Sequence, residues 1–302
     1  NHIRSAYIDV IDVAYQTHIA NITGLAHVFS SDMMLSADGA RLWVAHKMIG
    51  KVTVVSTTSR RIISVLDTGA ETNHPNFAEL NGTTYAFVTV GALDETKVYK
   101  QRDPEVPPTY VGAIKASGVQ PHGLWPSADN TRMYILNEHS DSVDVVDITN
   151  KNFRIIKTLS VGQEGQGLIY VSNAVPTGPG TQALGTQGLN PKLPPQNILV
   201  AITTSTPTPK ETKKEPATAL INIRQVAGLD MVKVIGRNLK LNTTYTVTAD
   251  SKKYGAKGLP LLDFKASTMS PSGCEGGAPQ VLAFFKFDGV FEPGSLNVVE
   301  SF

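Results

Sequence analysis

Two histidines stand at the same point of two similar segments of this chain. His74 lies in "TNHPNFAELNGTTYAFVTVG" (72–91), and His122, 48 positions later, lies in "VQPHGLWPSADNTRMYILNEH" (119–139). Neutral imidazole nitrogens bind copper, zinc and haem iron. A repeated fold that gathers these histidines would therefore create a metal or ligand site. The alternative is structural: each ring caps a main-chain carbonyl at a turn where a strand begins.

Other residues beside these positions offer further ligand atoms. Glu71, Asn73 and Glu164 lie near the same strand starts and could supply oxygen ligands or a general base. Acidic residues in such loops are more often simply solvated. His27 would join the two histidines if the extra residues of its longer loop fall after it.

The repeat does not place a histidine in every copy. The positions that match His74 and His122 in the neighbouring repeats lie near Ser31 and Gly167. His46 and His139 follow predicted second strands, and we expect both side chains to be exposed. Whether two or three imidazoles converge therefore depends on His27.

The composition, the net charge and the absence of known motifs exclude several classes of function. It has 302 residues, a formal net charge of +1 and no concentrated basic stretch, so a nucleic-acid partner is not expected. A single cysteine, Cys274, excludes an internal disulfide and a multi-cysteine metal site. The chain has no CxxCH motif for covalent haem, and no HExxH, GxSxG or phosphate-loop motif. No apolar run predicts a membrane-spanning helix. The first residues are not a signal peptide, so an export signal, if used, is absent from this chain.

Strand-like segments recur with a period of about 45 residues. The segments "AYIDVIDV" (6–13), "KVTVVSTT" (51–58) and "SVDVVDIT" (142–149) match one another. Upstream, "LSADGARLWVAH" (35–46) matches "PSADNTRMYILN" (126–137) almost residue for residue. Each period holds four short strands, which is typical of a β-propeller blade. The alternative is a β-sandwich whose internal similarity is coincidental.

These segments resemble the YVTN-type β-propeller repeat. The resemblance rests on "SADG" or "SADN", the strand that follows it, and the later V-x-V-V-D pattern, and it covers roughly residues 6–172. It implies a propeller fold and an extracytoplasmic location: periplasmic, cell-surface or secreted. It does not specify a function, because the family includes structural, binding and catalytic members.

Only about three and a half blades are visible, whereas about seven would be usual for the resembled family. They start in a third strand and end in an inner strand at "GQGLIYVSN" (165–173). An open stack would leave apolar strands and unpaired edges in water. We therefore expect N-terminal blades of a parent protein to be missing, or a neighbouring subunit to complete the ring. The strand-like "NILVAITT" (197–204) could add part of a blade.

The composition predicts three parts in an all-β chain. Residues 1–173 are the β-propeller segment, and residues 174–216 are a loop and linker rich in Pro, Gly and Thr. Residues 217–302 return to strand-like segments at the spacing of a small antiparallel β-sandwich. We expect this last part to serve in adhesion, docking or structure.

Two classes of function fit these features, and whether the protein is an enzyme stays open. The leading hypothesis is an extracytoplasmic binding or surface-assembly protein without its own catalysis, whose partners are other protein subunits or surface components. The competing one is a metal- or haem-dependent oxidoreductase that holds copper, zinc or haem at the channel mouth through His74 and His122, with or without His27. A lyase or lactonase would need a complete set of general bases, which the sequence does not show.

Overall fold

The computed structural model describes residues 2, 4–150, 152–162, 164–170, 196–202, 216–226, 229–266, 280–285 and 291–301. The chain divides into two compact units, Asn1–Gly185 and Thr186–Phe302. In the described ranges the regular structure consists of β-strands and short 3₁₀ helices. No helix within these ranges is long and apolar enough to cross a membrane.

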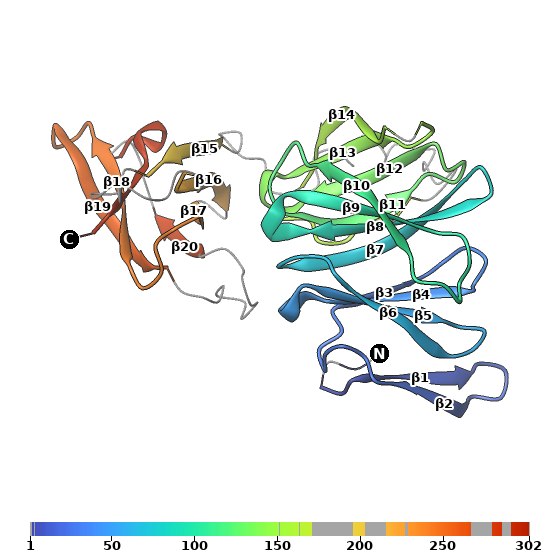
Figure 1. Ribbon diagram of the computed structural model, residues 1–302. Helices are drawn as coiled ribbons and strands as arrows, with labels where there is room; N and C mark the ends of the chain where they lie inside the picture. Colours follow the sequence, from blue (N-terminus) through green and yellow to red (C-terminus); the bar gives the residue numbers. More distant parts are fainter. Residues whose placement is uncertain are drawn as a thin grey trace, which may run out of the picture. The chain divides into compact units, whose positions relative to one another are not determined.

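The first unit contains a two-stranded hairpin followed by three four-stranded antiparallel sheets, in which consecutive strands are neighbours (Figure 1). The hairpin consists of β1 (Tyr7–Asp12) and β2 (Thr17–Thr23). Sheet A consists of β3 (Asp32–Leu35), β4 (Arg41–His46), β5 (Lys51–Ser56) and β6 (Arg61–Asp67). Sheet B consists of β7 (Thr72–Leu80), β8 (Thr83–Val90), β9 (Glu95–Gln101) and β10 (Thr109–Lys115). Sheet C consists of β11 (Pro121–Pro126), β12 (Arg132–Asn137), β13 (Ser142–Asp147) and β14 (Arg154–Ser160).

The predicted cycle of four antiparallel strands is confirmed in all three sheets. The β1–β2 hairpin stands where the sequence predicts a third and a fourth strand. The inner strand predicted over 165–173 is wrong for residues 165–170, which form no strand, and 171–173 lie outside the described residues. Residues 164–170 instead lie beside sheet C, where Tyr170 stacks on Tyr134 of β12 with ring centroids 5.5 Å apart.

Central strands of sheets A and B are apolar on both faces because each of these two sheets packs against a neighbour on either side. On β4, Trp43 and Ala45 pack against sheet B, whereas Val44 between them packs against the hairpin. On β8, Phe87 joins the core between sheets B and C. Such burial stabilises the fold by about 1.5–3 kcal/mol for each large side chain. The alternation of period two therefore produces a stack of sheets.

Side chains of sheet B bind the main chain of β11, which is an edge strand paired only with β12. Asn73 Nδ2 donates to the carbonyl oxygen of Pro121 at 3.1 Å. Asn76 Nδ2 donates to that of Leu124 at 2.9 Å. These pairs join residues 48 positions apart, one repeat of the sequence. The bonds satisfy carbonyls that no further strand covers.

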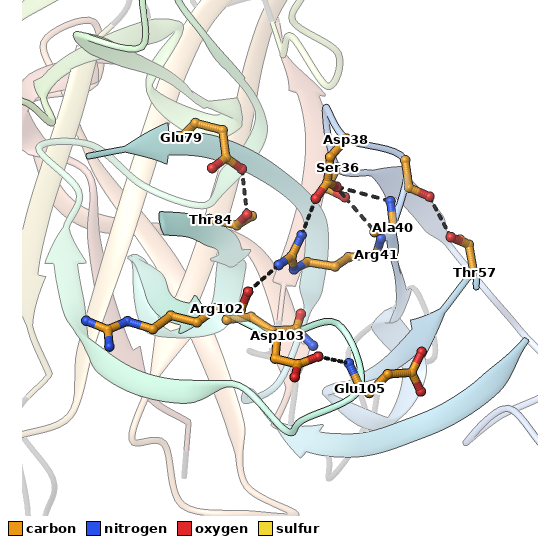
Figure 2. Close-up of polar contacts among 12 residues, drawn as sticks. Ser36, Asp38, Ala40, Arg41, Thr57, Glu79, Thr84, Arg102, Asp103 and Glu105 are labelled. Atoms are coloured by element: carbon orange, nitrogen blue, oxygen red, sulfur yellow. Dashed lines mark hydrogen bonds and ion pairs between the residues drawn. The ribbon is translucent and has the colours of Figure 1, made fainter. Parts of the chain in front are cut away.

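A loop of sheet B also forms hydrogen bonds with sheet A (Figure 2). Arg41 on β4 is buried, and its Nη1 lies 2.6 Å from Asp38 Oδ2 while its Nη2 donates to the carbonyl oxygen of Arg102 at 2.8 Å. In the same loop, between β9 and β10, the Glu105 carboxylate accepts hydrogen bonds from Ser56 and Ser59. The loop therefore holds the turn ends of sheets A and B together.

The second unit has two sheets that share one hydrophobic core. One consists of β15 (Gln196–Ala201), β16 (Thr218–Val226), β17 (Leu229–Arg237) and β20 (Gln280–Phe285). The other consists of β19 (Ala256–Lys265), β18 (Thr244–Ser251) and β21 (Asn297–Glu300). Ile221 and Val234 of the first sheet meet Tyr245 and Val298 of the second in the core.

One expectation for this part of the chain changes. The strand predicted at 197–204 does not extend a blade, because β15 pairs with β16 of the second unit, residue by residue from Gln196–Ile223 to Ala201–Thr218. Most of the predicted linker lies outside the described residues, as does Cys274.

Removing an inter-sheet amide should destabilise the first unit. Asn76 is buried, so Asn76→Ala leaves the Leu124 carbonyl without that donor, and we expect a loss of about 1–3 kcal/mol in the free energy of unfolding. Urea unfolding followed by tryptophan fluorescence measures it, because the two tryptophans, Trp43 and Trp125, lie in the first unit. The exposed Asn152→Ala is the control, and equal midpoints for the two variants would contradict the role of this bond.

Candidate functional site

The two predicted histidines meet at the starts of neighbouring inner strands. His74 is on β7 and His122 on β11, and their ring centroids are 4.7 Å apart with a 55° angle between planes. In both sheets the pairing register with the second strand shifts at the histidine, between Thr72 and Pro75 and between Pro121 and Leu124. Such irregularities redirect side chains out of the regular pleat. The repeat thus brings the imidazoles together.

A carboxylate of the preceding sheet orients His74. Asp32, the first residue of β3, places Oδ2 2.7 Å from Nδ1 of His74. An ionised carboxylate can only accept a hydrogen bond, so the Nδ1–H group of His74 donates one to Asp32. The side chain of Asp32 is 26% exposed and that of His74 is 28% exposed. This pair is therefore the solvent-accessible part of the cluster.

A carbonyl of the following segment orients His122. Nδ1 of His122 lies 2.8 Å from the carbonyl oxygen of Gln166. A carbonyl oxygen can only accept a hydrogen bond, so Nδ1–H is the donor. The segment reaches this position because Gly123 lets it approach: a Cβ at Gly123 would stand 2.7 Å from that same oxygen and 2.9 Å from the nitrogen of Leu168. Gly123 thus permits the contact that fixes the ring.

Glu138 lies beside His122 and completes the cluster. It starts the 3₁₀ helix η3 (Glu138–Ser140), and its main-chain N–H donates to the carbonyl oxygen of Gln120 at 3.0 Å. Its Oε1 accepts from Gln166 Nε2 at 2.9 Å, and its Oε2 lies 4.0 Å from Nε2 of His122. The carboxylate is buried, so it places negative charge close to the imidazole.

Burial keeps His122 neutral. It lowers the pKa of His122 to about 3, and the positive charges of His74 and Lys47 act in the same direction. The hydrogen bond to Gln166 opposes this shift without outweighing it. A neutral ring whose proton is on Nδ1 carries its lone pair on Nε2, the nitrogen that faces Glu138.

The other predicted site residues do not join the two rings as ligands. His27 accepts the N–H of Phe29 through Nδ1 at 3.0 Å, and the described residues show no contact between His27 and either ring of the pair. Asn73 bonds to β11 rather than to a ligand position. Glu164 lies 3.7 Å from Nδ1 of His139. Glu71 is not solvated as an acidic loop residue would be, because only 1% of its surface is exposed.

The expectation that His46 and His139 are exposed is wrong. Both are buried, at 0% and 2% exposure. His46 contacts Thr53 Oγ1 through Nε2 at 2.8 Å, and its burial lowers its pKa. The main-chain N–H of His139 donates to the carbonyl oxygen of Val119 at 3.2 Å, so the turn after β12 packs against the segment that leads into β11 of the same sheet. The sequence of one repeat does not show that these two histidines become buried.

Three residues of the cluster are not predicted from the sequence: Asp32, Glu138 and Gln166. The repeat alignment marks Ser31 and Gly167, each one residue from a true participant. No sequence signal marks Glu138. As they are placed, no three His, Cys, Asp or Glu side chains among the described residues form a group ready to hold a metal ion.

Acidification should destabilise the first unit through His122. The unfolded histidine has a pKa of about 6.5 and the folded one about 3, so between these values the unfolded state binds more protons. Stability therefore falls as the pH decreases across this window. We expect His122→Gln to flatten the pH dependence of the urea midpoint in buffer with EDTA. The exposed His18→Gln should keep the wild-type slope, and an unchanged slope in His122→Gln would refute the effect.

Comparisons with known proteins show weak structural similarity. No protein-family model and no curated protein sequence matches the chain. A hydrazine synthase of Kuenenia stuttgartiensis is 15% identical with a TM-score of 0.45, over 76% of this chain and 56% of that one, so this chain spans little more than half its length. A protein of unknown function from Desulfotomaculum acetoxidans is 10% identical with a TM-score of 0.47, over 99% and 83% of the two chains. The periplasmic gluconolactonase PpgL of Pseudomonas aeruginosa is 15% identical with a TM-score of 0.43, over 92% and 79%. At these identities and TM-scores, the similarities assign neither a family nor an activity to this chain.

Proposed function

We propose that sheets A, B and C are successive blades of a β-propeller, and that the protein is an extracytoplasmic binding or surface-assembly protein without catalysis of its own. Support for the blades comes from the strand order, which is the same in all three sheets, and from the cores between them. In a propeller the first strand of each blade lines the central channel. Here those strands are β3, β7 and β11.

The observation that carries the proposal is the meeting of one polar group from each successive repeat. Asp32 comes from β3, His74 from β7, His122 from β11 and the Gln166 carbonyl from the segment that follows β14. We call these groups, together with Glu138, the mouth cluster. Each imidazole has one nitrogen fixed by an oxygen acceptor. A pre-organised set of polar groups at the end of inner strands is what a binding site requires.

The second unit takes the role of an adhesion or docking module in this proposal. Its two sheets and their shared core form the small β-sandwich that we propose for this part of the chain. Its partners would be other protein subunits or surface components. The mouth cluster then binds a ligand while this unit attaches the protein.

A ligand screen with a turnover control tests this function. The full chain is screened by thermal shift against sugars, organic acids, lactones, peptides and metal ions, beside the double variant His74→Ala/His122→Ala. A true ligand at 100 times its Kd stabilises the wild type by about 2.7 kcal/mol. We expect at least one such ligand, absent from the double variant and recovered unchanged by mass spectrometry.

The outcomes separate binding from catalysis. The exposed His18→Ala serves as the control and should bind like the wild type. A compound that the wild type converts and the double variant does not would overturn the non-catalytic role in favour of an enzyme such as a metal- or haem-dependent oxidoreductase. A screen in which no compound distinguishes the wild type from the double variant would remove the mouth cluster as the binding site.

A further inference from the structure

Two hydrogen-bond acceptors face each other in the mouth cluster. Because Nδ1 of His122 donates to the Gln166 carbonyl, the neutral ring has a lone pair on Nε2. Opposite stands Glu138 Oε2, which is buried and has no hydrogen-bond donor among the described residues. The two atoms are 4.0 Å apart, which is longer than a hydrogen bond. A lone pair against a buried carboxylate oxygen is unfavourable unless a hydrogen-bond donor or a positive group lies between them.

The ring of His74, whose centroid is 4.7 Å from that of His122, offers a third ligand atom. Its Nδ1 is engaged by Asp32, and no hydrogen bond involves its Nε2 in the part of the chain that the structure describes. A carboxylate or carbonyl that accepts the Nδ1 proton is the usual outer support of a histidine that binds metal through Nε2. Asp32 and Gln166 give this support to the two rings.

We propose that the mouth cluster binds one divalent transition-metal ion through Nε2 of His74, Nε2 of His122 and the carboxylate of Glu138, with Asp32 and Gln166 as positioning residues. This inference rests on the proposed function and names its ligand. Two imidazoles and one carboxylate suit zinc or copper, and they leave a coordination position for an external group.

The spacing of the rings agrees with a shared ion. A ring centroid lies about 3.2 Å from a metal bound at its nitrogen, so two centroids 4.7 Å apart subtend an angle of about 95° at the metal. This angle lies near the square-planar and octahedral values. Around such an ion, ligand atoms stand about 3 Å apart, so Glu138 would have to move about 1 Å towards His122 from its present 4.0 Å. Without that movement, the described side chains form no three-ligand group.

The charges around the cluster favour a cation. Asp32 and Glu138 contribute two negative charges, and the positive groups whose fields reach His122 are His74, when protonated, and Lys47. Glu138 is buried, so its attraction for a metal ion is screened less than that of a surface carboxylate. A metal ion would also supply the positive group that Glu138 Oε2 lacks.

Titration of the full chain with Zn²⁺ and, separately, with Cu²⁺ tests the proposal. After EDTA treatment and its removal, calorimetry should show one equivalent of metal bound by the wild type, and Co²⁺ substitution should give visible absorption bands of a bound ion. We expect His122→Gln and Glu138→Gln to weaken binding at least tenfold. Asp32→Asn, which disturbs an outer support, should weaken it by about 10–100-fold.

A competing surface site provides the control. His2 and His18 both contact Asp9, at 2.7 and 3.2 Å, and could bind added metal. His18→Gln should leave the mouth-cluster equivalent intact. Glu138→Gln keeps an oxygen for Gln166, so its melting temperature in EDTA should equal or exceed that of the wild type, which separates loss of a ligand from loss of fold.

Each outcome decides the proposal. Binding that survives Glu138→Gln and His122→Gln but is lost in His18→Gln would overturn it, as would the absence of stoichiometric binding of either ion. Neither result touches the proposed binding role, which fails only if a compound is turned over or no ligand depends on the two histidines. Metal binding together with turnover would keep this inference and reject the non-catalytic role.

Discussion

The inner edge of each sheet is the constraint on which the first unit depends. An inner strand pairs with one neighbour only, so its other edge carries carbonyls that need donors. Sheet B supplies them to β11 from Asn73, Asn76 and Thr89, whose hydroxyl donates to the carbonyl oxygen of His122 at 2.6 Å. Two of these bonds span one repeat length of 48 residues. The bonds that satisfy the edge therefore also set the distance between the two imidazoles.

The electrostatics of the mouth cluster follow from this arrangement. Burial beneath the next segment makes a charged His122 unfavourable and lowers its pKa. The same burial weakens the screening of Glu138, which would otherwise be a solvated carboxylate. A neutral imidazole beside a buried anion is a site suited to a cation, whereas an exposed pair of the same residues would simply form a weak ion pair.

Much of the fold follows from the sequence in physical terms. Alternation of period two predicts strands, and the cycle of about 45 residues predicts four of them in each repeat. The recurrence of a turn and a histidine at fixed spacing predicts that His74 and His122 are neighbours. Residues 165–170 do not form the predicted strand, because an apolar segment forms a strand only if a partner strand is present to pair with its main chain.

The sequence by itself determined the repeat, the four strands of each sheet and the equivalence of His74 and His122, because these depend on periodicity along the chain. The tertiary structure decided which atoms meet: that Asp32 and Gln166 orient the rings, that Glu138 lies beside His122, and that His27 stands apart. It also decided that His46 and His139 are buried. Each of these facts depends on how closely one sheet or segment approaches the next, and that distance is set by packing between residues far apart in the chain.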